Sequence, residues 1–352
     1  MPKTNPFENS IYIRPKNYCK QENNFNRLLE ALTENQFINV NAEYGIGKTT
    51  SVKTLFYYLE KENKAKTFFI NIDKTESIDD FFILFVNSII KQLSEEHIEK
   101  IKNQFAEKIS SENSIQFTNK QTSLEEATFY FEEILNYVQT NFAKAIIAID
   151  EFHQAKNYPE KNPLSSIKSA LARFTNIQVL FISSTNLSKT LKTKSLLIVK
   201  PDEDIYKNFI KKKFKKSKIK IDTKGLDKLF LLSKGKPYYV QLISSRLFEQ
   251  SKKEINEQIV DETFAKIVNE SNSSFFMIKN LLTPYQLKLL RAIAKQNIAK
   301  QVTSASFINK NNLNAPSSVK TALTSLLEKE LIVREKNSYQ ISNMILNFWL
   351  AD

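Results

Sequence analysis

One nine-residue segment constrains the fold of this chain more than any other. Residues 42–50 read AEYGIGKTT and lie between a short apolar stretch, Gln36–Asn41, and a segment with apolar residues at helical spacing, Thr49–Lys61. The segment matches the pattern G-x-x-x-x-G-K-[ST], except that Ala42 replaces the first glycine. Two of only four glycines in the chain fall in this loop. A glycine-rich turn from a strand into a helix N-terminus predicts backbone N–H groups that converge on a phosphate.

The residue types of the loop indicate how a nucleotide and a magnesium ion would be held. Gly45 and Gly47 permit unusual backbone angles, and Lys48 is placed to contact the β- and γ-phosphates. The hydroxyl of Thr49 is placed to ligate Mg²⁺. We therefore expect ATP and Mg²⁺ as ligands. The predicted nucleotide contacts are Glu43, Tyr44, Gly45, Ile46, Gly47, Lys48, Thr49 and Thr50.

A second motif supplies the carboxylates that phosphoryl transfer needs. The apolar stretch Ile146–Glu151 (IIAIDE) ends in two acidic residues about a hundred positions after the loop. We expect Asp150 to hold the Mg²⁺ shell and Glu151 to orient the attacking water, because this chemistry depends on positioning and charge. His153 follows closely, and we interpret it as a packing or hydrogen-bonding residue rather than a catalyst.

Two further segments are candidates for the same site. The apolar stretch Val179–Ile182 is followed by Ser-Ser-Thr-Asn, and Thr185 or Asn186 would contact the γ-phosphate or the water at the carboxyl end of a strand. The alternative is a polar loop that caps the next helix. Arg173, one of six arginines, is a candidate for a finger that acts in trans on another copy, and the alternative is an exposed helix face.

Strand-like and helix-like segments alternate over the first 200 residues, which favours a parallel sheet covered by helices on both faces. Further strands are expected at 66–72, 145–149, 177–182 and 195–199, and further helices at 77–109, 124–141 and 165–174. The expected fold class is therefore α/β. A P-loop ATPase domain over 1–202 is followed by a helical lid over 203–275 and a winged helix over 276–352.

The winged helix is predicted from the order of its elements, which is three helices and then two short strands around a polar turn. These helices are expected at Pro284–Lys295, Ser304–Asn311 and Ser317–Glu330. The third helix would enter a major groove with Lys320, Thr321 and Thr324 exposed over a core of Val319, Leu323, Leu326 and Leu327. Lys310, Lys320, Arg334 and Lys336 are spaced to contact phosphates.

The formal net charge of +13 is unevenly distributed. Residues 1–200 carry 25 basic and 23 acidic side chains, whereas 201–352 carry 26 and 15. The excess in the C-terminal part favours a polyanionic partner, with double-stranded DNA as the first candidate and a protein partner or self-association as the alternative. The run Lys211–Lys220 (KKKFKKSKIK) is either part of this surface or a solvated helix face.

Composition excludes several classes of protein. The 11% aromatic content and the nine prolines exclude a disordered or collagen-like chain. The apolar run 145–149 is far shorter than the roughly 20 residues of a membrane span. The first ten residues lack the apolar core of a secretory signal, and the single Cys19 forms no intrachain disulfide. We therefore expect a cytoplasmic protein with no membrane partner and no metal other than Mg²⁺.

Several segments together resemble the archaeal-type ATPases, a branch of P-loop ATPases close to the STAND group and to the origin-recognition-like initiators of the AAA+ class. They are AEYGIGKTT, IIAIDEFHQ, FISSTN, SKGKP and SSVKTALTSLLEKELIVREKNSYQISNMILNFWL. The resemblance implies that a Gly-x-Pro turn in the lid, here Gly235 and Pro237, approaches the nucleotide. This chain departs from the AAA+ pattern because no arginine lies near Pro237 before Arg246 or between Asn186 and Ile198. Those departures count against a ring with shared active sites.

The resemblance and the motifs together predict an ATPase, a switch whose nucleotide state controls DNA binding through the basic lid and winged helix. The alternative is a STAND-like signalling ATPase whose winged helix docks a protein. Salt-dependent binding of a duplex would favour the first, and nucleotide-locked self-association without DNA binding would favour the second.

Overall fold

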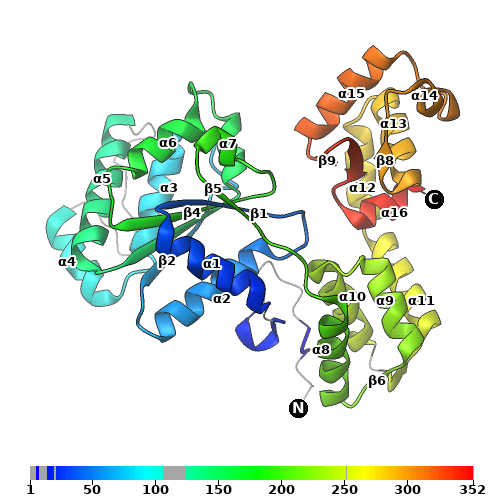
Figure 1. The fold of residues 1–352 in the computed structure, drawn as a ribbon, viewed down its shortest axis with the longest axis horizontal. Coiled ribbons are helices and arrows are strands. Elements are labelled where there is room, and N and C mark those ends of the chain that lie inside the picture. The colour runs from blue at the N-terminus through cyan, green and yellow to red at the C-terminus, as the bar shows by residue number, and fades with distance from the viewer. Residues whose placement is uncertain (1–4, 8–13, 20, 106–123, 251, 352) are drawn as a thin grey trace. The chain divides into compact units, whose positions relative to one another are not determined.

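The computed structural model describes residues 5–7, 14–19, 21–105, 124–250 and 252–351. The chain forms two compact units, one over Glu8–Pro201 and the other over Asp202–Asp352 together with Met1–Phe7. Figure 1 shows the elements of both units, which we describe separately. Residues 110–123, a serine- and asparagine-rich stretch that the sequence predicts to be a loop between the helices expected at 77–109 and 124–141, lie outside the described residues.

The first unit is built on a five-stranded sheet in which every pairing is parallel, with strand order β2-β3-β4-β1-β5. The strands are β1 Phe37–Asn41, β2 Lys66–Asn71, β3 Ala145–Asp150, β4 Ile177–Ser183 and β5 Lys194–Leu197. The helices are α1 Glu22–Glu34, α2 Lys48–Lys61, α3 Ile78–Ile90, α4 Glu95–Phe105, α5 Leu124–Asn141, α6 Pro163–Leu171 and α7 Ser188–Leu191, with 3-10 turns η1 Pro15–Asn17 and η3 Phe152–Asn157. All five expected strands are present, and the predicted α/β class is confirmed.

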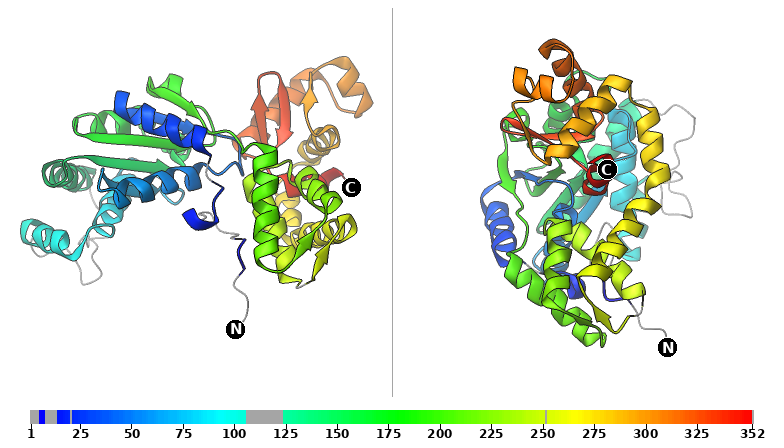
Figure 2. Two further views of the ribbon diagram at one scale, coloured as in Figure 1. Left: turned by 60° about the horizontal axis from the view of Figure 1, so that its bottom comes forward. Right: turned by 90° about the vertical axis from the view of Figure 1, so that its right-hand side faces the viewer.

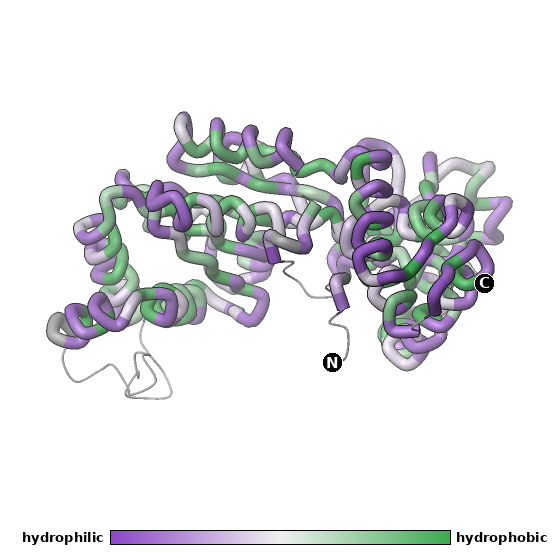
Figure 3. Tube along the Cα trace, turned by 90° about the horizontal axis from the view of Figure 1, so that it is seen from below, coloured by the Kyte–Doolittle hydropathy of each residue, from purple (hydrophilic) through white to green (hydrophobic). Residues whose placement is uncertain are grey.

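Helices cover both faces of this sheet, as Figure 2 shows. Side chains alternate between two cores along β3, because neighbouring residues of a strand point to opposite faces. Ile147 and Ile149 join the core under α3 and α5, whereas Ile146 and Ala148 join the core under α1 and α2. This double burial explains why the strand is apolar at successive positions. In Figure 3, which is coloured by hydropathy, the strands of the sheet are largely hydrophobic, whereas the helices combine hydrophobic and hydrophilic residues.

One helix prediction in this unit was too long. The segment expected as a single helix over 77–109 is divided into α3 and α4 by a turn at 91–94. Both helices still bury one apolar face, since Phe81, Phe85 and Ile89 of α3 and Ile98 of α4 are in the core. The apolar periodicity continues across the turn, and periodicity alone therefore did not locate the break.

Residues 202–270 of the second unit form helices of 11 to 14 residues that correspond to the expected lid. They are α8 Glu203–Lys216, α9 Thr223–Ser233, α10 Pro237–Glu249 and α11 Glu257–Glu270, with a two-strand pairing of β6 Lys220–Ile221 and β7 Glu254–Ile255. Three of these helices begin with a side-chain cap, from Asp202, Asp222 and Asn256. Pro237 occupies the first turn of α10, where its missing N–H costs no hydrogen bond.

The winged-helix elements follow in the predicted order within the same unit. They are α12 Asn272–Asn280, α13 Pro284–Gln296, β8 Ala299–Lys300, α14 Ala305–Lys310, α15 Pro316–Glu328, β9 Ile332–Glu335, β10 Ser338–Ile341 and α16 Met344–Ala351. The three short strands form one antiparallel sheet. On α15, Val319, Leu323 and Leu326 are buried and Lys320 is exposed, as expected, whereas Leu327, also predicted to lie in the core, is only half-buried.

The last helix joins the winged helix to the lid. The backbone N–H of Met344 donates to the buried Tyr239 hydroxyl of α10 at 2.9 Å. Phe348 packs edge-on against Phe264 of α11 with ring centroids 4.7 Å apart, and Trp349 contacts Phe275 of α12. Residues 202–352 therefore form one compact unit, and the boundary predicted at 275/276 stays a prediction.

Candidate nucleotide site

The glycine-rich loop turns from β1 into α2 with two left-handed glycines. Gly45 has φ 82° and Gly47 has φ 96°, a region where other residues are strained. Ala42 does not have a positive φ, so a Cβ is tolerated at this position, where the pattern has glycine. Lys48, the first residue of α2, is buried and its Nζ donates to the Ala42 carbonyl at 3.3 Å. The sequence thus places a cation and a helix N-terminus at the carboxyl edge of the sheet.

The structure brings the two predicted magnesium ligands into direct contact. The Thr49 hydroxyl donates to Oδ2 of Asp150 at 2.6 Å, although the residues are 101 positions apart. The other oxygen of Asp150 accepts the backbone N–H of Glu151 at 3.0 Å. Mg²⁺ is usually bound by one or two carboxylate or hydroxyl oxygens of the protein, together with phosphate oxygens and water, and Asp150 and Thr49 provide such oxygens beside the glycine-rich loop. The residues present therefore fit a magnesium ion.

The Asp150 carboxyl is buried, and Lys48 and Lys53 of α2 lie close enough to act on its charge. Asp150 is 1% exposed, and burial raises the pKa of its carboxyl despite the opposing hydrogen bonds from Thr49 and Glu151. Burial lowers the pKa of Lys53 on α2, and the nearby Asp150 carboxylate opposes that shift. A divalent cation beside Asp150 would favour its ionised form.

Glu151 has a backbone conformation that non-glycine residues rarely adopt. It follows β3 with φ 57° and ψ 29°, in the left-handed region, and its side chain is 36% exposed. Such strained residues are concentrated at functional sites. Glu151 therefore has both the position and the exposure that a water-orienting carboxylate requires.

His153 connects this carboxylate to the end of β4. The ring is 1% exposed, with Nδ1 3.5 Å from Oε2 of Glu151 and Nε2 2.9 Å from the Ser184 hydroxyl. A carboxylate only accepts hydrogen bonds, so Nδ1 carries the proton when it faces Glu151, and Nε2 then accepts from Ser184. The sequence interpretation of His153 as a hydrogen-bonding residue agrees with this geometry, but its two partners had no visible sequence signal.

Other residues at this edge were also missed. Asn39 is fully buried in β1, where its amide donates to the Ser183 hydroxyl at 3.0 Å and its oxygen accepts the Leu187 N–H at 2.9 Å. These bonds fix the loop after β4 relative to β1. The signal was present, because Asn39 is a polar residue between the apolar Ile38 and Val40 at the centre of a largely buried strand.

The two residues proposed from the loop after β4 are exposed. The Asn186 side-chain oxygen accepts the Ser188 N–H at 2.9 Å at the start of α7, as the capping alternative expected, and the Thr185 carbonyl accepts from Ser183. Ser184 is instead the residue of this loop that contacts His153. The catalytic role of Asn186 stays a prediction.

Arg173 is not brought to the glycine-rich loop of its own chain. It lies in the turn between α6 and β4, before the strand begins, and the loop lies at the carboxyl edge of the sheet beyond the seven residues of β4. The guanidinium pairs with Glu132 of α5 and is exposed. Any contact of Arg173 with a nucleotide would therefore be made in trans.

Pro237 belongs to the second unit, where it is buried at the start of α10. The turn before it contains Lys234 with φ 51° and Gly235 with φ 65°. Its predicted contact with the nucleotide stays a prediction.

The predicted polyanion contacts differ in their surroundings. Lys310 and Lys320 are exposed on α14 and α15. Arg334 and Lys336 lie on either side of Glu335, and the Arg334 guanidinium lies 5.8 Å from the centre of the Tyr339 ring. In the lysine run on α8, Lys213 is buried and donates to the Pro6 carbonyl at 2.8 Å, so this lysine has a structural role.

Among the residues that the structure describes, no group of three or more histidine, cysteine, aspartate or glutamate side chains could hold a metal ion. Within the same ranges, no helix combines the length and the hydropathy needed to cross a membrane.

Comparison with known proteins matches two parts of the sequence to family models. Residues 18–184 match the family "Nephrocystin 3, N-terminal", and residues 273–352 match the family "Probable winged helix domain". No curated protein sequence matches the chain.

Solved structures match nearly the whole chain. A Walker-type ATPase of Pyrococcus abyssi aligns with a TM-score of 0.69 at 15% identity, covering 99% of this chain and 100% of that one. The ORC1 protein of Aeropyrum pernix, solved in complex with DNA, aligns with a TM-score of 0.52 at 11% identity, covering 94% and 91%. The ORC2 protein of the same organism, solved as ADPNP and ADP complexes, gives a TM-score of 0.54 at 13% identity, covering 94% and 89%.

These matches establish the fold. The chain has the P-loop ATPase fold with a C-terminal winged helix, and the fold that the resemblance implied is confirmed. At 11–15% identity the likeness shows the fold alone, so activity and partners depend on the site described above.

Proposed function

We propose that this protein is a Mg²⁺-dependent ATPase switch whose nucleotide state controls the binding of duplex DNA. The single observation that carries the nucleotide part is the hydrogen bond between Thr49 and Asp150, because it joins the two motifs at one point. In this proposal the loop over 43–50 surrounds the phosphates, Lys48 offsets their charge, and Thr49 and Asp150 hold Mg²⁺. When bound, Mg²⁺ neutralises charge that develops on the phosphates.

Glu151 orients the attacking water in the proposed reaction, and its left-handed backbone fixes the direction of its side chain. His153 acts as a positioning residue, since its Nδ1 faces Glu151 and its Nε2 is held by Ser184. At 3.5 Å, Nδ1 and Oε2 are close enough for an ion pair when the ring is protonated, and contacts between catalytic groups often shorten when the substrate binds. The arrangement connects the end of β4 to the carboxylate that meets the water.

The lid and the winged helix transmit the nucleotide state as one body in this proposal. The support comes from α16, whose Met344 bonds to Tyr239 of the lid and whose Phe348 packs against Phe264. If Pro237 approaches the nucleotide, as the resemblance implies, a change at the phosphates would move α10 and the attached winged helix together. The solved complex of the ORC1 protein with DNA supports DNA as the polyanion.

The test is a mobility-shift measurement on a random-sequence duplex with ATP, with ADP and without nucleotide, each at two salt concentrations. We expect binding that weakens with salt and differs between the ATP and ADP states. Equal binding in all nucleotide states would contradict the proposed switch. An absence of binding at low salt would contradict DNA as the partner.

A second function is favoured by one observation. Phe276, Met277 and Leu281 on and after α12 are 51%, 62% and 75% exposed. An exposed apolar surface of this kind is typical of protein contacts. In this alternative the chain is a STAND-like signalling ATPase whose winged helix docks a protein. Nucleotide-dependent self-association or partner binding in the absence of duplex binding would favour this alternative.

A further inference from the structure

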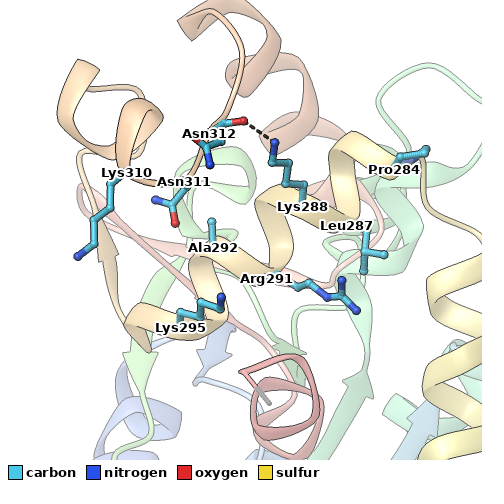
Figure 4. A pocket seen from close by; sticks show the side chains of 9 residues that line it. All are labelled: Pro284, Leu287, Lys288, Arg291, Ala292, Lys295, Lys310, Asn311 and Asn312. Carbon is cyan, nitrogen blue, oxygen red and sulfur yellow. Dashed lines mark hydrogen bonds between the residues drawn. The ribbon is translucent and has the colours of Figure 1, made fainter.

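A hollow in the winged helix is lined by four cationic side chains and by no carboxylate. Lys288, Arg291 and Lys295 come from α13, and Lys310 comes from the last position of α14. The hollow has a volume of ≈ 390 Å³, and Figure 4 shows these side chains around it. Asn311 and Asn312 complete its polar lining.

The surrounding sequence carries no negative charge to balance these cations. Between Ser271 and Leu327 there are seven basic residues and no acidic one. The stretch 328–336, which contains the first strand of the wing, has three acidic and three basic residues and is neutral. Six of the seven basic residues lie on helices and one, Lys300, lies on β8, so the unbalanced positive charge of the domain belongs mainly to its helices rather than to the hairpin of the wing.

Three of the four cations form no contact that holds the described part of the fold together. Lys288 donates to the Asn312 carbonyl at 2.5 Å, whereas Arg291, Lys295 and Lys310 are exposed and form no ion pair with any residue in the described ranges. Arg291 and Lys295 are four positions apart on one helix, a spacing at which like charges destabilise. A role in stability would place acidic partners here, so the cluster indicates an external anion.

The spacing of the cluster suits a regularly charged polymer. Lys288 and Lys295 are seven residues apart, or about 10 Å along the α13 axis at 1.5 Å per residue. One strand of a DNA duplex places a phosphate about every 3.4 Å along its axis, so about three phosphates lie within that length. Arginine and asparagine provide N–H donors for phosphate oxygens.

We propose that this hollow binds the phosphodiester backbone of duplex DNA and supplies most of the electrostatic affinity of the winged helix. The inference rests on the proposed DNA binding and locates it on α13 and α14 rather than on α15 and the wing. Lys310, already expected to contact a phosphate, belongs to the hollow.

Two matched triple variants test the proposal in the full-length protein. The hollow variant is Arg291→Ala, Lys295→Ala and Lys310→Ala, and the control is Lys320→Ala, Arg334→Ala and Lys336→Ala. Each removes one arginine and two lysines, so both change the net charge equally. The measurement is the affinity for a labelled random-sequence duplex by fluorescence anisotropy over a range of salt concentrations.

The slope of log affinity against log salt concentration becomes less steep by about 0.9 for each phosphate contact that is lost. We therefore expect the hollow variant to reduce this slope by about two to three units and the control variant to reduce it by less than about one. An unchanged slope in the hollow variant, or an equal change in both variants, would overturn the proposal. Tighter binding of polyglutamate than of DNA by the unmutated protein would overturn it as well, in favour of an acidic protein.

The outcomes separate this inference from the proposed function. If the unmutated protein binds no duplex in any nucleotide state, the DNA part of the proposed function fails. If it binds and only the control variant weakens binding, this inference alone fails. Melting temperature and ATP hydrolysis without DNA check that both variants are folded, because none of the six residues belongs to the nucleotide site.

Discussion

The nucleotide site and the winged helix show their chemistry in different ways. In the first unit, the candidate site consists of a few buried or strained positions, such as Asp150 and Glu151, that the strand ends bring together. In the winged helix, the informative feature is exposed charge spread over α13 and α14, with no motif and no strained residue among its four cations. A single substitution should therefore disable the first site, whereas the second should lose affinity in steps.

The largest effect is expected from Lys48→Ala. Removal of the cation proposed to face the phosphates should abolish ATP binding or reduce turnover by about 100-fold or more. Lys61→Ala, in the last turn of the same helix, is the matched control and should behave as the unmutated protein does. ATP affinity and steady-state hydrolysis measure both, and wild-type hydrolysis by Lys48→Ala would show that the site is wrongly assigned.

Glu151→Gln separates binding from chemistry. The amide keeps the size of the side chain but loses its charge, so ATP affinity should be retained while hydrolysis slows by at least about tenfold, about 1.4 kcal/mol in barrier. Single-turnover hydrolysis with saturating ATP measures the step directly. Normal hydrolysis by this variant would mean that another group orients the water.

His153→Ala tests the positioning role. We expect kcat to fall about fivefold, about 1 kcal/mol, with little change in ATP affinity, because the ring acts through Glu151 rather than on the phosphates. His153→Gln, which can restore a donor or acceptor near Nε2, should recover part of the loss. Ser184→Ala should slow hydrolysis without adding to the effect of His153→Ala, since both act through one connection.

A purely structural role would give a different pattern. Because His153 is buried, His153→Ala also lowers stability, and the melting temperature must be measured beside the rate. A loss of stability with an unchanged kcat, in both His153→Ala and Ser184→Ala, would contradict the positioning role.

The smallest effect is expected from Arg173→Ala. Its ion pair with Glu132 is exposed, and pairs of this kind contribute about 0–1 kcal/mol to stability. Hydrolysis by dilute protein should be unchanged, because Arg173 precedes β4 and lies at the opposite end of the strands from the glycine-rich loop. A loss of activity that grows with protein concentration would instead identify Arg173 as a finger acting in trans.

The same contrast explains how much of the molecule the sequence could predict. The strands of the first unit were predictable because burial on both faces requires uninterrupted apolar runs such as Ile146–Ile149. The sequence also pointed to Lys48, Thr49 and Asp150 as one site, because residue type and spacing define that chemistry. The structure supplied the hydrogen bond that joins Thr49 to Asp150.

The contacts that depend on tertiary structure were not predictable. His153 meets Ser184 across 31 positions, and no local pattern connects them. The helices α1 and α16 were also missed, and the role of α16 depends on aromatic contacts with helices far away in sequence. The basic hollow forms only when α13 folds beside the end of α14, which a count of charges does not show.

One measurement tests the central claim that the nucleotide site controls the basic domain. The affinity for a random-sequence duplex is measured with Glu151→Gln, which is expected to hold ATP without turnover, in the presence of saturating ATP and then of saturating ADP. A coupled switch should show affinities that differ by about tenfold, about 1.4 kcal/mol of coupling. Identical affinities in the two states, with both nucleotides shown to be bound, would contradict the account.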